Sequence, residues 1–226
     1  MKKGIVNIAL AMTAIAMTHC APKPQGPGSA NFDNFELRWV DHLNEVVTDS
    51  FNTDTISPLW GYNKKTDDSL ISTTDRPGWL SIRDTTDPAT GERRGARVTT
   101  SLTNLLFDCR VKMSLAMTDT TERAGIAVMR DTEHQYKICA GPSVDGRTSV
   151  DVIKVSDSNT HGTRVAQEII TCDSLELRIL SPNGRNMVFC YAPDGNAWVA
   201  LSEDMPLSYL TGDYLGRDPQ ISLFIE

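Results

Sequence analysis

The stretch "LLFDCRVKMSLAM" (residues 105–117) decides the fold class, because apolar and polar residues alternate over most of its length. One parity holds only apolar residues, namely Leu105, Phe107, Cys109, Val111, Met113, Leu115 and Met117. The other parity holds Asp108, Arg110, Lys112 and Ser114. Successive side chains of a strand point to opposite faces of a sheet, so this period of two predicts a strand with one face in a core and the other in water.

Similar alternation recurs along the rest of the chain, in "AGIAVMR", "QYKICA", "SVDVIKV", "TRVAQEII", "SLELRIL", "MVFCYA", "AWVAL" and "ISLFIE". Turn sequences with Asp-Gly or Asn-Gly separate several of these segments, as in "SVDGRTS", "SPNGRN" and "APDGNAW". Such dipeptides tolerate the positive φ that tight hairpins require. Many short strands at this spacing predict an all-β antiparallel sandwich. The one helical candidate is the weakly patterned segment 39–47.

The N-terminal segment 1–19 has the plan of a bacterial lipoprotein signal peptide. Two lysines precede an apolar run of about residues 4–17, which is too short for a stable membrane span. The run ends in "MTHC", which resembles the lipobox, whose cysteine is acylated and becomes the first mature residue. Met17 fits its apolar lead position, whereas His19 replaces the usual small residue. We therefore expect lipidation at Cys20, and the alternative is an ordinary or an uncleaved signal sequence.

Residues 20–34 are rich in Pro, Gly and Ser and are expected to form a flexible tether after the acylated cysteine. Residues 35–226 are then expected to form one domain, which is large enough to bury a core. Ala21 follows Cys20 in place of aspartate, which by analogy with lipoprotein sorting favours the outer membrane. The predicted location is the bacterial cell envelope, with attachment to the membrane through the lipid anchor. The sequence does not decide whether the domain faces the periplasm or the cell surface.

Composition restricts the partners and cofactors. Lys and Arg number 22 against 29 Asp and Glu, and loss of the two signal-peptide lysines lowers the formal net charge from −7 to −9. An acidic protein has no electrostatic reason to bind nucleic acid. Four cysteines remain after Cys20; export permits disulfides, but no Cys or His spacing predicts a metal site. No cofactor is expected, and the acidic loops 66–68, 83–88 and 156–159 leave only a structural calcium open.

Motifs within residues 49–83 resemble the opening of the concanavalin A-like C-terminal domain of bacterial β-xylosidases of glycoside hydrolase family 43. The motifs run Asp-x-Phe, Leu-Trp-x-aromatic, Ser-Leu and Pro-Gly-aromatic-Leu-x-Leu. The matching residues are Asp49, Phe51, Leu59, Trp60, Tyr62, Ser69, Leu70, Pro77, Gly78, Trp79, Leu80 and Ile82. Farther on, "ERAGIAVMRDTEHQYKI" and "LELRILSPNGRNMVFCYAPDGNAWVAL" are similar to later strands of that domain and to its Asp-Gly-x-x-Trp hairpin. The resemblance covers the chain from Asp49 to its C-terminus.

This resemblance implies a concanavalin A-like antiparallel β-sandwich of jelly-roll type. Two features depart from the family. Its Gly-rich, Phe-containing segment near the end is replaced by "YLTGDYLGRDPQISLFIE", and its propeller catalytic domain has no counterpart in the sequence. In those enzymes the domain buttresses the propeller and lends a loop near the active site. The resemblance therefore implies a fold rather than an activity.

No catalytic group stands out in the sequence. A glycosidase needs two carboxyl groups across the scissile bond, and the candidates Glu92, Glu122, Asp131, Glu133 and Glu168 lie in no distinguishing pattern. His42, His134 and His161 lie in no nucleophile context, and phosphate-binding loops and dinucleotide fingerprints are missing. We therefore expect a non-catalytic protein, and the alternative is a glycoside hydrolase that acts on oligosaccharides through an unidentified carboxylate pair.

Carbohydrate binding is the function that the aromatic residues favour. Sugar rings pack their C–H faces on aromatic rings while their hydroxyls bond to polar side chains. The candidate carbohydrate-binding residues are Trp60, Tyr62, Arg76, Trp79, Tyr136 and Trp198, with Asn63 and Asp194 as polar neighbours and Tyr209 and Tyr214 as candidates for a loop pocket. The alternative for each ring is packing in the core or at its rim. Trp60 and Trp198 match positions that recur in the resembling family, which favours packing for these two.

In "RPGWLSI" (residues 76–82), Leu80 and Ile82 share one parity, while Trp79 and Ser81 share the other. If the aliphatic pair faces the core, the indole points to the outer surface, either as a cover of a sheet edge or as the wall of a groove. The predicted function is a non-catalytic carbohydrate-binding or glycosidase-partner lipoprotein, which binds a glycan or a separately encoded glycoside hydrolase. A purely structural envelope protein is the remaining alternative.

Overall fold

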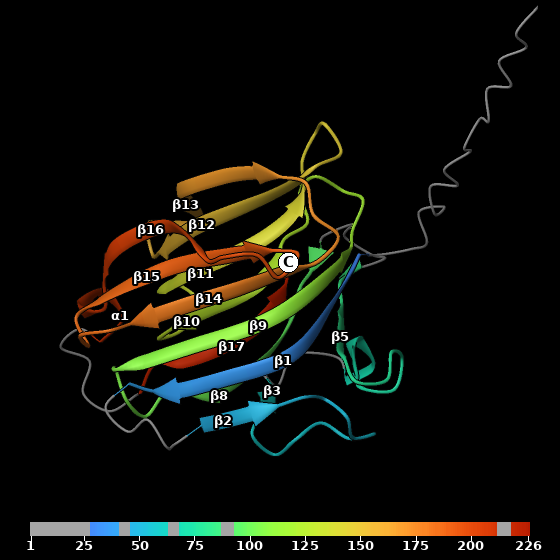
Figure 1. Cartoon of the computed structure of the whole chain (residues 1–226), viewed down its shortest axis with the longest axis horizontal. Coiled ribbons are helices and arrows are strands. Elements are labelled where there is room, and N and C mark those ends of the chain that lie inside the picture. The colour runs from blue at the N-terminus through green and yellow to red at the C-terminus, as the bar shows by residue number, and fades with distance from the viewer. Residues whose placement is uncertain (1–27, 41–45, 63–67, 87–92, 212–217) are drawn as a thin grey trace, which may run out of the picture.

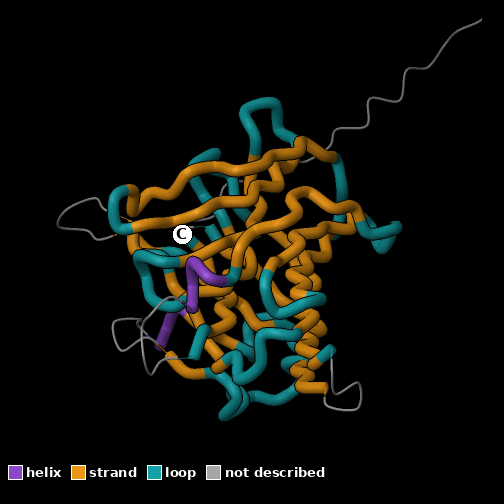
Figure 2. Tube along the Cα trace, turned by 90° about the vertical axis from the view of Figure 1, so that its left-hand side faces the viewer, coloured by secondary structure: helices purple, strands orange, loops and turns teal. Residues whose placement is uncertain are grey.

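The protein is a sandwich of two antiparallel β-sheets that face each other, as the sequence pattern predicts (Figure 1). The computed structural model describes residues 28–40, 46–62, 68–86, 93–211 and 218–226. Strands make up most of this part of the chain, and helix is confined to short pieces (Figure 2). The expected concanavalin A-like class is thus confirmed at the level of architecture.

The first sheet, which we call sheet A, is nearer the viewer in Figure 1. Its strands follow the order β16-β15-β14-β9-β1-β5-β4, and β2 pairs with β1 beside this path. Their bounds are Val199–Pro206 (β16), Asn186–Pro193 (β15), Leu175–Ser181 (β14), Phe107–Ala116 (β9), Ser29–Trp39 (β1), Leu80–Arg83 (β5), Ile71–Ser72 (β4) and Val46–Asp49 (β2). Strands from both ends of the sequence therefore meet in one sheet, so its surface combines residues that are far apart in the chain.

The second sheet, sheet B, lies behind it with the order β13-β12-β11-β10-β17-β8-β3. The bounds are Asn159–Ile170 (β13), Thr148–Ser156 (β12), Gln135–Pro142 (β11), Ala124–Met129 (β10), Gln220–Ile225 (β17), Ala96–Ser101 (β8) and Gly61–Tyr62 (β3). The remaining elements are the paired strands Thr85–Thr86 (β6) and Arg93–Arg94 (β7), the 3₁₀ turn Asp68–Leu70 and the helix Ser208–Thr211 (α1). The described residues include no helix that is long and apolar enough to cross a bilayer.

Strand β9 confirms the prediction made from residues 105–117. Phe107, Cys109, Val111 and Met113 are at most 1 % exposed and face the interior, whereas Arg110 and Lys112 on the other parity are partly exposed. Asp108 shares the outer parity but is also buried, because arginine side chains cover it. The alternation therefore gives the inside and outside of sheet A.

The predicted turns also occur where Gly was expected to supply a positive φ. Gly146, Gly184 and Gly195 have φ values of 78°, 67° and 72°, and Gly78 of the Pro-Gly pair has 79°. The backbone N–H of Trp79 donates to the carbonyl of Arg76 at 3.0 Å and closes the turn before β5. These turns set the register of the strands that follow them.

Two boundaries differ from the expectation. Strand β1 begins at Ser29, inside the segment predicted as a tether, because Ala30 and Phe32 alternate with polar residues and are fully buried against the core. The predicted domain start at residue 35 is thus too late. The helical candidate 39–47 is also wrong at both of its described ends, since Trp39 closes β1 and Val46 opens β2.

Candidate functional site

The outer face of sheet A brings two tryptophans into one line across the strands. Cross-strand pairs link Asp33 to Lys112, Lys112 to Glu176, and Glu176 to Ala192. Continuing the registers of β1–β5 and β15–β16 by one residue places Trp79 beside Asp33 and Trp198 beside Ala192. We call this set the tryptophan row: Trp79, Asp33, Lys112, Glu176, Ala192 and Trp198. It has an aromatic ring at each end and charged groups between them.

Trp79 lies on the outer face, as its parity predicts. Leu80 and Ile82 are fully buried, whereas Trp79 is only partly buried. The guanidinium carbon of Arg76 lies 3.9 Å from the indole centroid, and Lys112 Nζ lies 5.9 Å from it. Because an exposed cation–π contact contributes only about 0.5–1 kcal/mol, a ligand ring can displace Arg76 at small cost. The structure therefore brings two of the predicted residues, Arg76 and Trp79, into direct contact.

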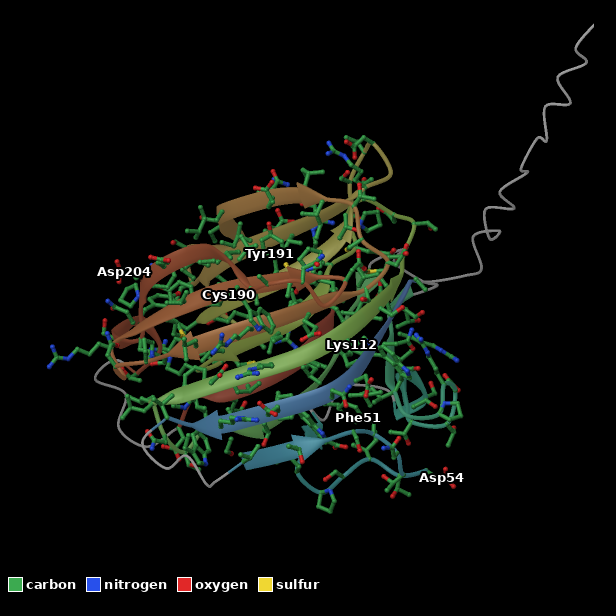
Figure 3. All side chains as sticks on the ribbon, in the orientation of Figure 1. Phe51, Asp54, Lys112, Cys190, Tyr191 and Asp204 are labelled. Carbon is green, nitrogen blue, oxygen red and sulfur yellow. The ribbon has the colours of Figure 1, made fainter. Side chains whose placement is uncertain are left out.

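Trp198 forms the other end of the row, just before β16. It is partly buried, and the guanidinium carbon of Arg178 lies 5.6 Å from its ring centroid. Cys190 and Ala192 on the neighbouring strand β15 are outward by parity and small, so no long side chain of this strand rises beside the ring. Figure 3 shows Cys190 and Lys112 on the same face of the sheet. The sequence analysis gave two roles for Trp198, packing and sugar binding, and a partly buried ring on the outer face agrees with both.

A shallow hollow of about 170 Å³ opens between the two rings. Its walls are Asn34, Glu36, Arg110, Val111, Lys112 and Glu176. It lies beside the irregularity of β1 between Asp33 and Glu36, where Asn34 has a φ of 50°. Closed pockets for whole ligands start at about 300 Å³, so this hollow has room for a part of a ligand that lies along the row.

Arginine and acid side chains next to the row hold one another in place. Asp108 accepts bonds from Arg178 at 2.7 and 2.8 Å and from Arg110 at 2.8 Å. Burial alone would raise the pKa of Asp108, but the hydrogen bonds and charges of the two guanidiniums outweigh burial and lower the pKa. Glu36 bonds to Arg38 at 2.6 Å. The charged atoms of these acidic and arginine side chains are therefore already bonded to one another.

The charged residues Lys112 and Glu176 inside the row form fewer bonds to described side chains than Asp108 and Glu36 do. Among the described residues, neither Lys112 nor Glu176 forms an ion pair, although they are direct cross-strand neighbours. The ammonium of Lys112 offers three donors, and the carboxylate of Glu176 offers acceptors only. The row therefore presents both kinds of hydrogen-bonding partner that sugar hydroxyls require.

Two candidate binding residues lie in the core: for Trp60 this is the packing role that the sequence favoured, whereas for Tyr136 it corrects the prediction of a binding role. Trp60 is 4 % exposed and packs against Phe35 and Phe51 at centroid distances of 4.7 and 6.1 Å. Tyr136 is fully buried between Phe189 and Tyr209. A buried ring has no free face for a sugar. Tyr62 ends strand β3, and its side chain lies outside what the structure describes.

The other predicted positions are scattered. Asp194 accepts the backbone N–H groups of Asp173 and Ser174 at 2.9 and 2.8 Å and so braces a turn. The phenol of Tyr209 donates to the carbonyl of Val155, and Lys154 Nζ lies 4.2 Å from its ring centroid. Cys20, Asn63 and Tyr214 lie outside the described residues, so lipidation at Cys20 stays a prediction.

The described carboxylates that the sequence offered as catalytic candidates have other surroundings. Glu122 is 2 % exposed and accepts the backbone N–H of Gly28 at 3.0 Å, which joins the start of β1 to the loop after β9. Asp131 accepts from Arg130 at 3.1 Å and contacts His134 at 2.8 Å. Glu133 and Glu168 are exposed, and Glu92 lies outside the described residues. They do not form a pair across one cleft.

Cysteines and possible metal ligands do not form a second centre in the part of the chain that the structure describes. Cys109, Cys139, Cys172 and Cys190 are free thiols, and burial raises the pKa of each. No group of three His, Cys, Asp or Glu side chains comes together among these residues. Structural calcium in the acidic loops, which extend partly beyond the described residues, stays a prediction.

The sequence missed the charged members of the row. Lys112 was predicted only as an outward residue, and Asp33 and Glu176 were not candidates. The usable signal was their outward parity, but pairing between β1, β9 and β14 decides that they lie side by side. Those strands are separated by tens of residues, so spacing alone does not reveal their alignment.

Comparison with known families adds to this geometry. The profile of the beta xylosidase C-terminal concanavalin A-like domain matches residues 48–220. None of the curated proteins compared with the chain matches it.

Solved structures share the fold at low sequence identity. The GH43B protein of the xyloglucan PUL of Bacteroides ovatus has a TM-score of 0.64 and 15 % identity, over 79 % of this chain and 35 % of its own. A GH43_12 protein from a capybara gut metagenome has a TM-score of 0.69 and 12 % identity, over 81 % of this chain and 35 % of its own. Beta-agarase A from Zobellia galactanivorans has a TM-score of 0.53 and 14 % identity, over 92 % of this chain and 86 % of its own. The chain thus spans about a third of the length of the first two.

Proposed function

Because the chain belongs to the family of beta xylosidase C-terminal concanavalin A-like domains, we propose that it binds carbohydrate without hydrolysing it, through the tryptophan row on sheet A. The observation that carries the proposal is the alignment of Trp79 and Trp198 on one outer row with Lys112 and Glu176 between them. Aromatic faces with polar groups beside them are the combination that sugar rings need.

The absence of catalysis is supported by the surroundings of the described carboxylates. Glu122 and Asp131 are bound to their own neighbours. Hydrolysis of a glycosidic bond needs two carboxyl groups across the scissile bond, and Glu122, Asp131, Glu133 and Glu168 do not form such a pair across one cleft. A pair that hydrolyses a glycosidic bond is therefore not favoured here.

The test is affinity electrophoresis and calorimetry with xylan, arabinoxylan and xyloglucan. We expect binding by the wild type and a loss of roughly tenfold or more for Trp79→Ala and for Trp198→Ala, which corresponds to about 1.4 kcal/mol each. The control is Val165→Ala, an exposed apolar residue on β13 of sheet B, 44 % exposed. Equal binding by all four proteins, or no binding to any glycan, would overturn the proposal. Release of reducing sugar that Glu176→Gln abolishes would overturn its non-catalytic part.

A second candidate function is support of a separately encoded glycoside hydrolase. It is favoured by the comparison in which the matched part makes up 35 % of two longer GH43 proteins. Light scattering after mixing the chain with an isolated GH43 propeller tests it, since a stable complex elutes at the summed mass. Elution as two separate species would exclude it for that enzyme.

For cellular location, we propose that Cys20 carries the lipid that holds the domain at the bacterial envelope, in the outer membrane. Support comes from the sequence of residues 1–20 and from the short stretch between Cys20 and the start of β1 at Ser29. Buried acyl CH₂ groups contribute roughly 0.8 kcal/mol each, so two or more chains hold a protein stably. Metabolic labelling with a palmitate analogue is expected to mark the wild type and not Cys20→Ser. Equal labelling of both would exclude this position.

A further inference from the structure

We infer that the tryptophan row takes one neutral, linear glycan chain that runs across the strands of sheet A and contacts both rings at once. This inference rests on the proposed function and adds the length, charge and direction of the ligand. Its parts follow from the spacing of the rings, from the order of the charges between them and from the hollow in the middle.

The spacing requires a chain rather than a single sugar. The strands from β5 to β16 are separated by five steps, through β1, β9, β14 and β15. At ~4.8 Å a step, the ends of the row lie about 24 Å apart, which is the length of several sugar rings in an extended chain. A monosaccharide or disaccharide reaches one tryptophan only. A chain that lies along the row reaches Trp79, the polar centre and Trp198 in turn.

The order of charges favours a neutral chain. Along the row Asp33, Lys112 and Glu176 alternate in sign at neighbouring strands. A glycan with a carboxylate on each unit would place negative charges beside Asp33 and Glu176, and one with an amine on each unit would place positive charges beside Lys112. Hydroxyl groups donate and accept hydrogen bonds, so a neutral chain satisfies groups of both signs.

The surface between the rings also fits this direction. The hollow beside Asn34 and Glu176 has a volume of about 170 Å³ and lies between the tryptophans. Ala192 and Cys190, the outward residues of β15 next to Trp198, have small side chains and are only 2 % and 7 % exposed. A chain across the strands thus meets a ring, a depression with donors and acceptors, and a second ring, without a large side chain of β15 in its path.

Calorimetry with a length series tests the inference, using xylobiose, xylotetraose and xylohexaose together with the corresponding cello-oligosaccharides. In at least one series, we expect affinity to rise by tenfold or more from the disaccharide to the hexasaccharide, with one hexasaccharide bound per protein. Trp79→Ala and Trp198→Ala should each abolish this length dependence, so that the hexasaccharide binds like the disaccharide. Val165→Ala should retain it.

The outcomes separate this inference from the proposed function. If polysaccharide binding depends on both tryptophans but two hexasaccharides bind per protein, or length has no effect, the rings are independent sites and the inference is wrong while the proposed function stands. If no glycan binds, the proposed function fails first.

Charge is tested by a trigalacturonate to hexagalacturonate series and by chitosan hexamer. We expect both to bind at least tenfold more weakly than the preferred neutral hexasaccharide. Glu176→Gln should raise the affinity for hexagalacturonate relative to that for the neutral chain, because it removes one of the repelling carboxylates. Tighter binding of either charged hexamer by the wild type would overturn the choice of a neutral ligand.

Discussion

The indole nitrogen of Trp60 donates a hydrogen bond to Asp49 Oδ2 at 2.9 Å, and the other oxygen of this carboxylate accepts the backbone N–H of Phe51 at 2.8 Å. Phe51 has a φ of 50°, a conformation that bulky residues seldom adopt. One carboxylate thus holds a strained residue and a buried ring together between β2 and β3. The Asp-x-Phe and Trp motifs of the sequence therefore have a structural role. We call the joined residues Asp49, Phe51 and Trp60 the corner.

Replacement of Asp49 tests that corner. Asp49→Ala leaves the Trp60 N–H without its acceptor and removes the bond to Phe51, so we expect a loss of about 2 kcal/mol in the free energy of unfolding. Urea denaturation at neutral pH measures it. Asp54→Ala is the control, because Asp54 is exposed on the same loop region (Figure 3) and should change stability by less than about 0.5 kcal/mol. Equal stability of the two variants would show that the corner does not depend on the carboxylate.

Gly125 in the centre of sheet B has no room for a side chain. A Cβ atom at this position would lie 2.1 Å from the carbonyl oxygen of Ile138 on the paired strand, which is backbone and cannot move aside freely. Gly125→Ala should therefore cost more than about 3 kcal/mol or prevent folding. Gly61→Ala is the matched control in the same sheet, since its Cβ would meet ordinary contacts at 3.6 and 3.7 Å. Thermal melting of both variants checks the difference; similar melting temperatures would contradict it.

The lowered pKa of Asp108 predicts a specific loss of stability in acid. The unfolded chain binds a proton at this carboxyl at about pH 3.9, whereas the folded protein holds it ionised to lower pH through Arg178 and Arg110. The contribution of Asp108 is thus complete above the unfolded pKa and is lost as pH falls through the folded pKa. Asp108→Asn should be less stable than the wild type at pH 7 by about 1–3 kcal/mol, and the gap should narrow below about pH 4.

Urea midpoints between pH 3 and pH 7 measure that gap. Asp145→Asn is the control: its pKa is also lowered, chiefly by Arg147, but the pair is exposed to solvent on a turn. It should show little pH-dependent difference from the wild type, because exposed ion pairs contribute little. A gap for Asp108→Asn that is the same at pH 3 and pH 7 would exclude the ionised carboxylate as its source.

Alternation predicted which face of a strand lies inside, and it did so for β9 and for Leu80 and Ile82 of β5. It also contained the signal for Tyr136, which shares parity with Ile138 and Ala140 and is buried with them. Tyr136 was wrongly predicted to bind carbohydrate because the prediction considered its aromatic ring and not its parity in the strand. The early start of β1 was missed for a similar reason, because Pro and Gly before it outweighed the short alternation at Ala30 and Phe32.

The alignment of the residues of the tryptophan row across the strands could not be predicted from the sequence. Trp79 precedes β5, which is next to the edge strand β4, and Trp198 precedes the edge strand β16; four strands, β1, β9, β14 and β15, lie between β5 and β16. Hydrogen-bond register brings Asp33, Lys112 and Glu176 into one line, and a shift of one residue in any pair would turn a side chain to the other face. Periodicity fixes the face of each residue but not its neighbour on the next strand.

Trp79 provides the last prediction, because its sequence left open whether the ring covers the sheet or forms a wall for a ligand. The ring is partly buried and contacts Arg76, so Trp79→Ala should reduce stability by about 1–2 kcal/mol, less than the roughly 3–5 kcal/mol expected for Trp60→Ala in the core. Chemical denaturation ranks the two variants, and glycan binding is measured on the folded fraction. A folded Trp79→Ala protein that has lost binding identifies the ring as part of a ligand surface. If it instead loses as much stability as Trp60→Ala and its folded fraction binds normally, the indole is a cover of the sheet.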